Sequence, residues 1–441
     1  MKYIIQLACM LAMLQSEAQT NFGKRWIVGI RGYNVLFDTP LVHDTIDVIN
    51  DHGYNRGISN ICDSNAVIRI ACDGGDILNS TLQLMENGDS ILPREFMKRF
   101  SGVARTPQAS IILPMENRKY YVFTPTVSDS FHVNVWLNQP SLDWNFDQLL
   151  YHVVDLNQNG GLGKVVEKKK PLLQNTPLKK SMMAACRHAN GKDWWLLKMA
   201  GDSNMVYTFL VKQDTILRYP NQGIPFPFRG TNDVWGQMKF SKDGTKWALT
   251  YDAYSDTVYT PSCDVMLAQF DRCTGRLGGF QHFHKPGEYG FLGLEFSPNG
   301  NYIYTTRYSE IHQLDLSEGT WYNVYGEDTN FFCGYTTMEL APDNRIYIAR
   351  FDGLCKQMSR INNPDGKGWA CQFCPNCLRS QSNWGYLLGL PSMPNYELGS
   401  TGQPCWPLEV GELVIEKAQL EIYPNPFIDE VNIAYQLATG E

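Results

Sequence analysis

The sequence predicts an all-β fold, a β-propeller of six or seven four-stranded blades. A hairpin pattern recurs along the chain at intervals of about 50 residues, which is the size of one propeller blade. The composition also favours turn-rich β-structure over helical bundles, with 37 Gly, 23 Tyr, 21 Phe and 11 Trp among 441 residues. A lone four-stranded sheet cannot bury both of its faces, whereas sheets stacked radially around a ring can.

Each copy of the repeat has an alternating apolar strand, a tight turn and a second strand rich in aromatic and β-branched residues. Asp-Gly or Asn-Gly at the turn supplies the positive φ that a short hairpin needs. The clearest copies are residues 238–249, 294–304 and 338–348. Looser copies place their turns at Asn65, Asn117 and Gly191. We therefore expect six hairpins, each forming the inner half of a blade.

An outer strand pair follows the hairpin in several units, as in residues 151–167, 265–277 and 311–321. A seventh blade can be built from the two ends of the propeller, with residues 25–29 pairing against 386–391. A β-sandwich pair uses similar short strands and glycine-rich turns, so it is the main competing fold.

The N-terminus predicts export. Lys2 precedes an apolar run over residues 3–14, and a small-residue cleavage pattern follows at Ser16-Glu17-Ala18. This is the layout of a signal peptide, and we assign it to residues 1–18 with cleavage near Ala18. No later segment has 18 consecutive apolar residues, so we expect no transmembrane span in the mature chain. The net charge of −7 argues against a nucleic-acid partner.

The pattern changes after the propeller, which we place at residues 24–395. Glycine and proline mark a linker over 396–417, and a strand, a proline-bounded turn and a second strand follow in 418–441. Because the chain stops soon after this second strand, we expect 418–441 to be a partial domain and the chain to be a fragment.

Two stretches resemble known families. Tyr423-Pro424-Asn425-Pro426-Phe427, followed by Val431-Asn432-Ile433, resembles the opening of the type IX secretion C-terminal sorting domain of Bacteroidota. The resemblance implies delivery by the type IX machinery to the medium or the outer-membrane surface. The body resembles the secreted WD-repeat-like (YVTN or quinoprotein-like) propellers that commonly precede such domains, through motifs at 188–195, 270–275, 296–300 and 388–391. That family implies blade geometry and no catalytic residues.

Candidate metal ligands are few. His282 and His284 are two apart, which places both imidazoles on one face of a strand, and Glu288 could complete a three-ligand site. The alternative is a polar loop between blades.

Cysteine usage fits an oxidising compartment. Cys371, Cys374 and Cys377 form a C-x-x-C-x-x-C run, for which we expect disulfides rather than zinc. Cys263 and Cys273, ten residues apart, are further disulfide candidates. A bond between these two requires the chain to double back between them.

The predicted function is a binding module whose partner is an extracellular protein or a glycan, with no cofactor and no catalytic residues. The sequence contains neither a G-x-S-x-G nucleophile elbow nor an H-E-x-x-H motif. The enzymatic alternative is a lyase, lactonase or glycosidase that uses carboxylates or histidines of the central channel, with Ca²⁺ as a possible cofactor. A purely structural role is a third reading.

Overall fold

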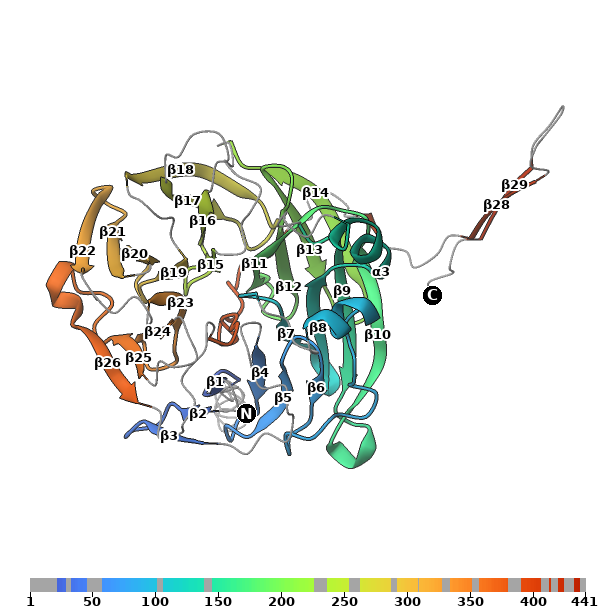
Figure 1. The fold of residues 1–441 in the computed structure, drawn as a ribbon, viewed down its shortest axis with the longest axis horizontal. Helices are drawn as coiled ribbons and strands as arrows, with labels where there is room; N and C mark the ends of the chain where they lie inside the picture. Colours follow the sequence, from blue (N-terminus) through green and yellow to red (C-terminus); the bar gives the residue numbers. More distant parts are fainter. Residues whose placement is uncertain are drawn as a thin grey trace, which may run out of the picture.

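Seven of the antiparallel sheets are arranged as blades around a central axis (Figure 1). The computed structural model describes residues 22–28, 33–45, 58–100, 106–138, 145–225, 236–253, 262–286, 292–307, 309–326, 334–350, 357–379, 390–405, 412–413, 419–423 and 432–436. The predicted fold class, an all-β propeller, is confirmed, and the number of blades is seven.

Five blades show four strands each, numbered from the hub outward. They are β7 (Ile111–Pro114), β8 (Lys119–Thr126), β9 (Gln148–Asp155) and β10 (Lys164–Leu173); β11 (Leu178–Arg187), β12 (Trp194–Ala200), β13 (Met205–Val211) and β14 (Ile216–Gly223); β15 (Met238–Phe240), β16 (Lys246–Ala253), β17 (Ser262–Phe270) and β18 (Leu277–Pro286); β19 (Gly293–Phe296), β20 (Tyr302–Arg307), β21 (Glu310–Asp315) and β22 (Thr320–Tyr325); and β23 (Tyr335–Leu340), β24 (Ile346–Arg350), β25 (Gln357–Ile361) and β26 (Phe373–Arg379).

Two blades show three strands among the described residues: β4 (Ser59–Cys62), β5 (Ile68–Cys72) and β6 (Ile77–Leu78); and β1 (Arg25–Val28), β2 (Tyr33–Leu36) and β3 (Val42–Thr45). The helical segments are short: α2 (Arg94–Phe100), η1 (Glu116–Arg118), α3 (Asp129–Phe131), η2 (His132–Trp136), η3 (Asn159–Gly161) and η4 (Gly368–Cys371). None of the helices in the described ranges is long and apolar enough to cross a membrane.

All six predicted hairpins are present as the first two strands of their blades. Glycine takes the positive φ at three of the turns, with values of 75° at Gly191, 70° at Gly244 and 67° at Gly300. Asn344 takes it in the last copy. In the first copy, which lacks the expected glycine, Ala66 adopts a φ of 59°. An L-residue there is strained, so the hairpin, rather than the residue's own preference, sets this conformation.

The seventh blade joins the two ends of the propeller. Strand β1 runs antiparallel to β4, because Cys62 N–H donates to Phe22 O at 2.9 Å and Ile27 N–H donates to Asn60 Oδ1 at 3.0 Å. Inner strands of neighbouring blades run in the same direction, so β1 occupies the second position of its blade. Residues 25–28, which were predicted to pair with 386–391, form a strand. Gly29 and residues 386–389 lie outside the described residues.

The C-terminal chain returns to the hub at the inner position of this blade. Leu390 N–H donates to Thr337 Oγ1 of β23 at 3.2 Å, and Ser392 N–H donates to Ile58 O beside β4 at 2.9 Å. These two bonds place residues 390–392 between the inner strands of the flanking blades. The ring is thus closed by chain from both ends of the propeller.

Trp194 and Trp195 show how the ring buries both faces of a blade. Both side chains are fully buried although they point to opposite sides of β12. The indole N–H of Trp194 donates to Pro114 O at 3.0 Å, and that of Trp195 donates to Arg272 O at 2.8 Å, in the two neighbouring blades. In a closed ring a neighbouring blade covers each face, so both belong to the core.

The assignment of residues 396–417 to a linker needs correction. Tyr396 is 5% exposed, and Cys405 is bonded to Cys273 of the β17–β18 turn. Further along, β27 (Glu412–Leu413) pairs with β14 at the outer edge of its blade. The propeller therefore includes the chain at least to Cys405.

The predicted signal peptide lies outside the described residues, as do Pro424 to Phe427 of the sorting motif. Tyr423 ends β28 (Gln419–Tyr423), which pairs antiparallel with β29 (Asn432–Gln436), with Ile422 opposite Ile433. The predicted strand, turn and second strand at the C-terminus therefore form a hairpin.

Candidate functional site

A cavity of about 590 Å³ lies in the hub of the propeller. Its walls come from β1, β7, β11, β15, β19 and β23, and from residues 392–398 of the C-terminal chain. Residues of two hairpin turns, Ser241 to Lys242 and Pro342 to Asp343, line it as well, so it is next to the face of the propeller that carries these turns. A volume of this size suits a small organic ligand.

Three buried charged residues from three blades meet in the wall of this hub cavity. Lys239 of β15 donates to the carboxylates of Glu295 on β19, at 3.2 Å, and of Glu339 on β23. Glu295 also accepts the backbone N–H groups of Phe296 at 2.9 Å and Leu340 at 3.0 Å. We call Lys239, Glu295 and Glu339 the hub cluster.

The hub cluster holds two carboxyl groups against one ammonium in a buried place. Burial raises the pKa of Glu339 to about 8, although Lys239 acts in the opposite direction. The neighbouring carboxylates raise the pKa of Lys239 and keep it protonated. Because a second ionised acid beside one ammonium would leave an unbalanced negative charge in the core, the buried Glu339 carboxyl holds its proton to a higher pH than an ordinary glutamate does.

The raised pKa of Glu339 predicts that the propeller loses stability as the pH rises. In the unfolded chain Glu339 has the ordinary carboxyl pKa of 4.5, whereas in the folded chain its pKa is about 8. The stabilisation is therefore complete below 4.5 and is lost as the pH rises toward 8, by at most about 1.4 kcal/mol per unit. Glu339→Gln imitates the protonated acid and should lack this slope. Urea denaturation of both proteins at pH 5, 6, 7 and 8 measures the difference; parallel profiles would contradict it.

Two glutamines also link the inner strands. The Gln108 amide exchanges two hydrogen bonds with the backbone of Met238, at 2.7 and 3.1 Å. The Gln237 oxygen accepts from Leu294 N–H at 3.1 Å and Met338 N–H at 2.8 Å, and its nitrogen donates to Met338 O. All of these groups are buried, so they fix the spacing of β7, β15, β19 and β23 around the cavity.

The C-terminal strap, which we define as residues 390–405, forms one wall of the hub cavity and then leaves the hub across the turn-bearing face. Met393 N–H donates to the Glu339 carboxyl. The buried Tyr396 ring packs edge-on against Trp194, with centroids 5.9 Å apart, and its hydroxyl donates to Ile112 O at 2.9 Å. The strap is thus anchored to three blades near the hub.

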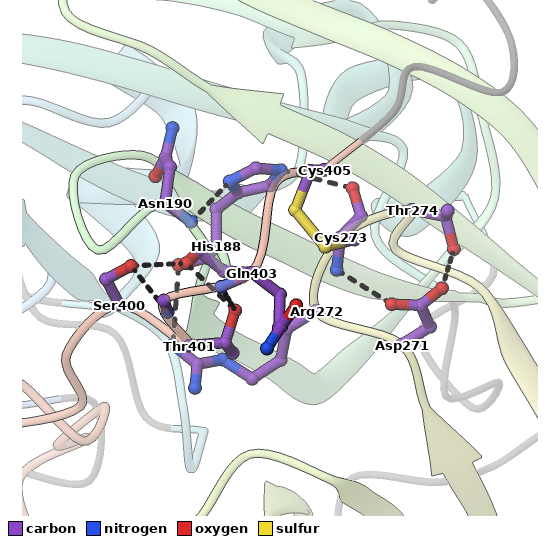
Figure 2. The surroundings of a disulfide bond; sticks show 12 residues. His188, Asn190, Asp271, Arg272, Cys273, Thr274, Ser400, Thr401, Gln403 and Cys405 are labelled. Carbon is purple, nitrogen blue, oxygen red and sulfur yellow. Dashed lines mark hydrogen bonds between the residues drawn. A yellow bond between two sulfur atoms is a disulfide. The ribbon is translucent and has the colours of Figure 1, made fainter.

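Figure 2 shows where the strap passes between blades β11–β14 and β15–β18. Thr401 N–H donates to Ala189 O at 2.9 Å, and the Arg272 guanidinium donates to Gly399 O at 2.5 Å. The disulfide between Cys273 and Cys405 joins residues 132 apart in sequence, with Cα atoms 5.2 Å apart. The strap wall of the cavity is therefore held by a covalent bond as well as by hydrogen bonds.

The mouth of the cavity carries charges of both signs. Lys24 pairs with Asp38 at 2.7 Å, and Lys242 donates to Asn344 Oδ1 at 2.5 Å. Asp343 accepts a hydrogen bond from Tyr347 at 2.8 Å. Lys24, Asp38, Lys242 and Asp343 all line the cavity, beside the apolar side chains of the strap. The site offers hydrogen bonds and charge at its entrance and a fixed, buried polar cluster in its wall.

The predicted metal ligands lie away from the hub, on the outer strand β18. His282 Nε2 and His284 Nδ1 both bond to Asp264 Oδ1, at 2.7 and 3.0 Å, and Glu288 lies outside the described residues. No group of three or more His, Cys, Asp or Glu side chains able to hold a metal ion occurs in the described ranges. The predicted alignment of the two histidines on one strand is observed, and the carboxylate they share is Asp264.

The described residues include two disulfides, which contain Cys273, Cys374 and Cys377 of the five candidate cysteines. Cys374 and Cys377 form a disulfide, whereas Cys371 is a free, buried thiol. Cys273 is bonded to Cys405 and not to Cys263. The reason is geometric: Cys263 lies near the start of β17 and Cys273 follows its end, so an extended stretch of about 23 Å, from Cys263 to Phe270, lies between the two cysteines. The side chain of Cys263 lies outside the described residues.

Sequence reasoning missed the hub cluster and the strap. The three hub residues stand at the same place in the repeat, one residue before the end of the first strand and between apolar neighbours: Lys239, Glu295 and Glu339. A charged residue within an apolar inner strand was the available signal. It becomes informative once the three strands are aligned by their turns.

No protein-family model matches the sequence, and no curated protein matches it. Several solved structures resemble its shape. A Lactobacillus plantarum protein is 12% identical, with a TM-score of 0.40, over 79% of this chain and 82% of its own. A provisionally named 6-phosphogluconolactonase from Bacteroides uniformis is 10% identical, with a TM-score of 0.44, over 83% and 98%. Hydrazine synthase from Kuenenia stuttgartiensis is 12% identical, with a TM-score of 0.38, over 76% and 95%. These values support no conclusion about the activity of this chain.

Proposed function

We propose that the protein is an exported β-propeller that binds a small ligand, or a short segment of an extracellular partner, in the hub cavity. The observation that carries this proposal is the cavity itself, which has fixed walls from six blades and a covalently anchored strap. Preformed walls lower the entropic cost of binding, because few side chains remain to be ordered when the ligand enters.

The export part of the proposal rests on the sequence. The N-terminal signal pattern and the Tyr423-Pro424-Asn425-Pro426-Phe427 motif support secretion through the inner membrane and then through a type IX pathway, to the medium or the outer-membrane surface. A chain recovered from either place should begin close to Gln19. A chain that is found inside the cell and still carries Met1 would contradict this part.

The hub carboxylates favour binding over catalysis. General acid–base catalysis needs a carboxyl group within hydrogen-bond reach of a substrate. Glu295 is already bonded to Lys239 and to two backbone N–H groups, and Glu339 to Lys239 and Met393. Their contacts hold the blades and the strap together, so we assign them a structural role.

Thermal-shift screening of the mature chain against free amino acids, mono- and disaccharides and nucleotides tests the binding site. A compound that occupies the cavity should raise the melting temperature of the wild type. Lys242→Trp, which places an indole at the mouth, should abolish that shift. Lys164→Trp, on the outer strand β10, is the matched control and should keep it.

Two outcomes would overturn the cavity assignment. In one, a compound raises the melting temperature equally in the wild type and in Lys242→Trp, because it then binds elsewhere. In the other, no compound in any of the classes raises the melting temperature of the wild type.

A further inference from the structure

Trp369 is the most exposed large apolar side chain in the described part of the protein, with 80% of its surface accessible. It lies in η4, within the connection between β25 and β26 that spans residues 362–372. Reversing the chain between adjacent strands takes about 2–5 residues. The corresponding connection in the preceding blade, between β21 and β22, spans only residues 316–319. This loop is therefore longer than the fold requires, and it presents an indole to solvent.

The loop is held rigidly under the indole. Gly368 N–H donates to Gln313 Oε1 at 2.7 Å, and Gln372 N–H donates to Trp369 O at 3.1 Å. The Tyr304 hydroxyl, which is buried in the preceding blade, donates to Pro364 O at 2.8 Å. Asn299 N–H donates to Asp365 Oδ1 at 3.0 Å from the neighbouring turn. An exposed aromatic ring on a fixed backbone loses little entropy when a ligand stacks on it.

The surroundings of Trp369 are polar. Lys367 bonds to Glu318 at 2.7 Å and to Asp315 at 3.2 Å, and Tyr322 donates to Glu318 at 3.0 Å. The other exposed large apolar side chains of the described residues belong to other blades: Val42, Val67, Leu84, Val133, Leu137, Leu162 and Val166. Centres of protein–protein interfaces are instead clusters of packed apolar groups.

We propose that Trp369 is a stacking platform for a neutral glycan. A pyranose ring carries C–H groups on one face, which are attracted to the negative face of an indole, while its hydroxyls reach polar groups around the edge. Asp315, Glu318 and Asp365 outnumber Lys367 around this site, so an acidic glycan is repelled. The platform lies on the same face as the cavity mouth, since both are built from turns at that end of the strands. It is a separate site.

Affinity gel electrophoresis tests the platform. Wild-type protein is run in native gels containing mixed-linkage β-glucan, xylan or galactomannan, with polygalacturonate as the acidic comparison. We expect retardation by at least one neutral polysaccharide and none by polygalacturonate. Trp369→Ala should weaken that binding about tenfold, and Trp369→Phe should retain most of it. Leu137→Ala truncates an apolar side chain in another blade that is also exposed, with 51% of its surface accessible, and should bind as the wild type does.

Several results would overturn the proposal: no retardation of the wild type by any neutral polysaccharide, equal retardation of Trp369→Ala, equal losses in Trp369→Ala and Trp369→Phe, or stronger retardation by polygalacturonate. Lys242→Trp separates this site from the hub cavity. If Lys242→Trp abolishes retardation and Trp369→Ala does not, the glycan occupies the cavity, so the platform is wrong and the proposed function stands. If Trp369→Ala loses retardation and Lys242→Trp keeps it, the result supports the platform, whatever ligand the cavity binds.

Discussion

Replacing Lys239 by methionine is expected to lower the free energy of unfolding by about 3–5 kcal/mol. The substitution removes the cation from the hub cluster and leaves Glu295 and Glu339 without their shared partner, in positions that are each 3% exposed. Methionine has a similar length and leaves little empty space, so the loss reports the unpaired carboxyl groups rather than a cavity. Urea denaturation at pH 7 measures the effect.

Lys242→Met is the matched control, because Lys242 is an exposed lysine three residues further along the chain, in the turn that follows β15. Its effect should stay within about 0.5 kcal/mol. Adding Glu295→Gln to Lys239→Met should recover part of the loss, since it removes the buried charge that the first substitution leaves unpaired. If Lys239→Met has the same free energy of unfolding as the wild type, or if the double variant has a lower free energy of unfolding than the single one, the hub cluster does not hold the blades together.

Breaking the disulfide is expected to have the second large effect. Cys405→Ser should lower the free energy of unfolding by about 4 kcal/mol, because the bond closes a loop between residues 132 apart and restricts the unfolded chain. Cys273→Ser and the double variant should lose the same amount, since each breaks the same bond. Denaturation of the three variants without reductant measures this.

The other disulfide provides the comparison. Cys374 and Cys377 are three residues apart, so their bond restricts a short loop, and Cys377→Ser should cost much less than Cys405→Ser. Equal losses for the two disulfides, or additive losses for Cys273→Ser and Cys405→Ser, would contradict the covalent anchoring of the strap.

The repeated hairpins could be predicted because their determinants are local. A turn residue with positive φ and the alternation of apolar side chains on either side lie within about a dozen residues, as around Gly244 and Gly300. The paired outer strands β17–β18 and β21–β22 follow from the same kind of signal. The spacing of the hairpins, which is the size of one propeller blade, then predicted a ring of blades. The number of blades depended on the seventh, whose strands come from both ends of the propeller.

The candidate site could not be predicted because its contacts are remote in sequence. Tyr396 donates to Ile112, which is 284 residues away, and Lys239 bonds to Glu339, which is 100 residues away. Glycine and proline around 399–407 are typical of a linker, and they are equally compatible with an extended strap lying on a protein surface. Local composition does not distinguish these two cases, since the difference lies in what the segment contacts.

The strap closes the ring at the hub and forms a wall of the hub cavity. Hydrogen–deuterium exchange with mass spectrometry on the wild-type chain tests it most directly. Ser392 N–H and Thr401 N–H donate to Ile58 O and Ala189 O, so a peptide covering 390–405 should exchange slowly, at a rate close to that of the inner strand β11. Exchange of this peptide at the rate of an unstructured chain, while the blades stay protected, would show that the strap is a free linker and that the cavity lacks this wall.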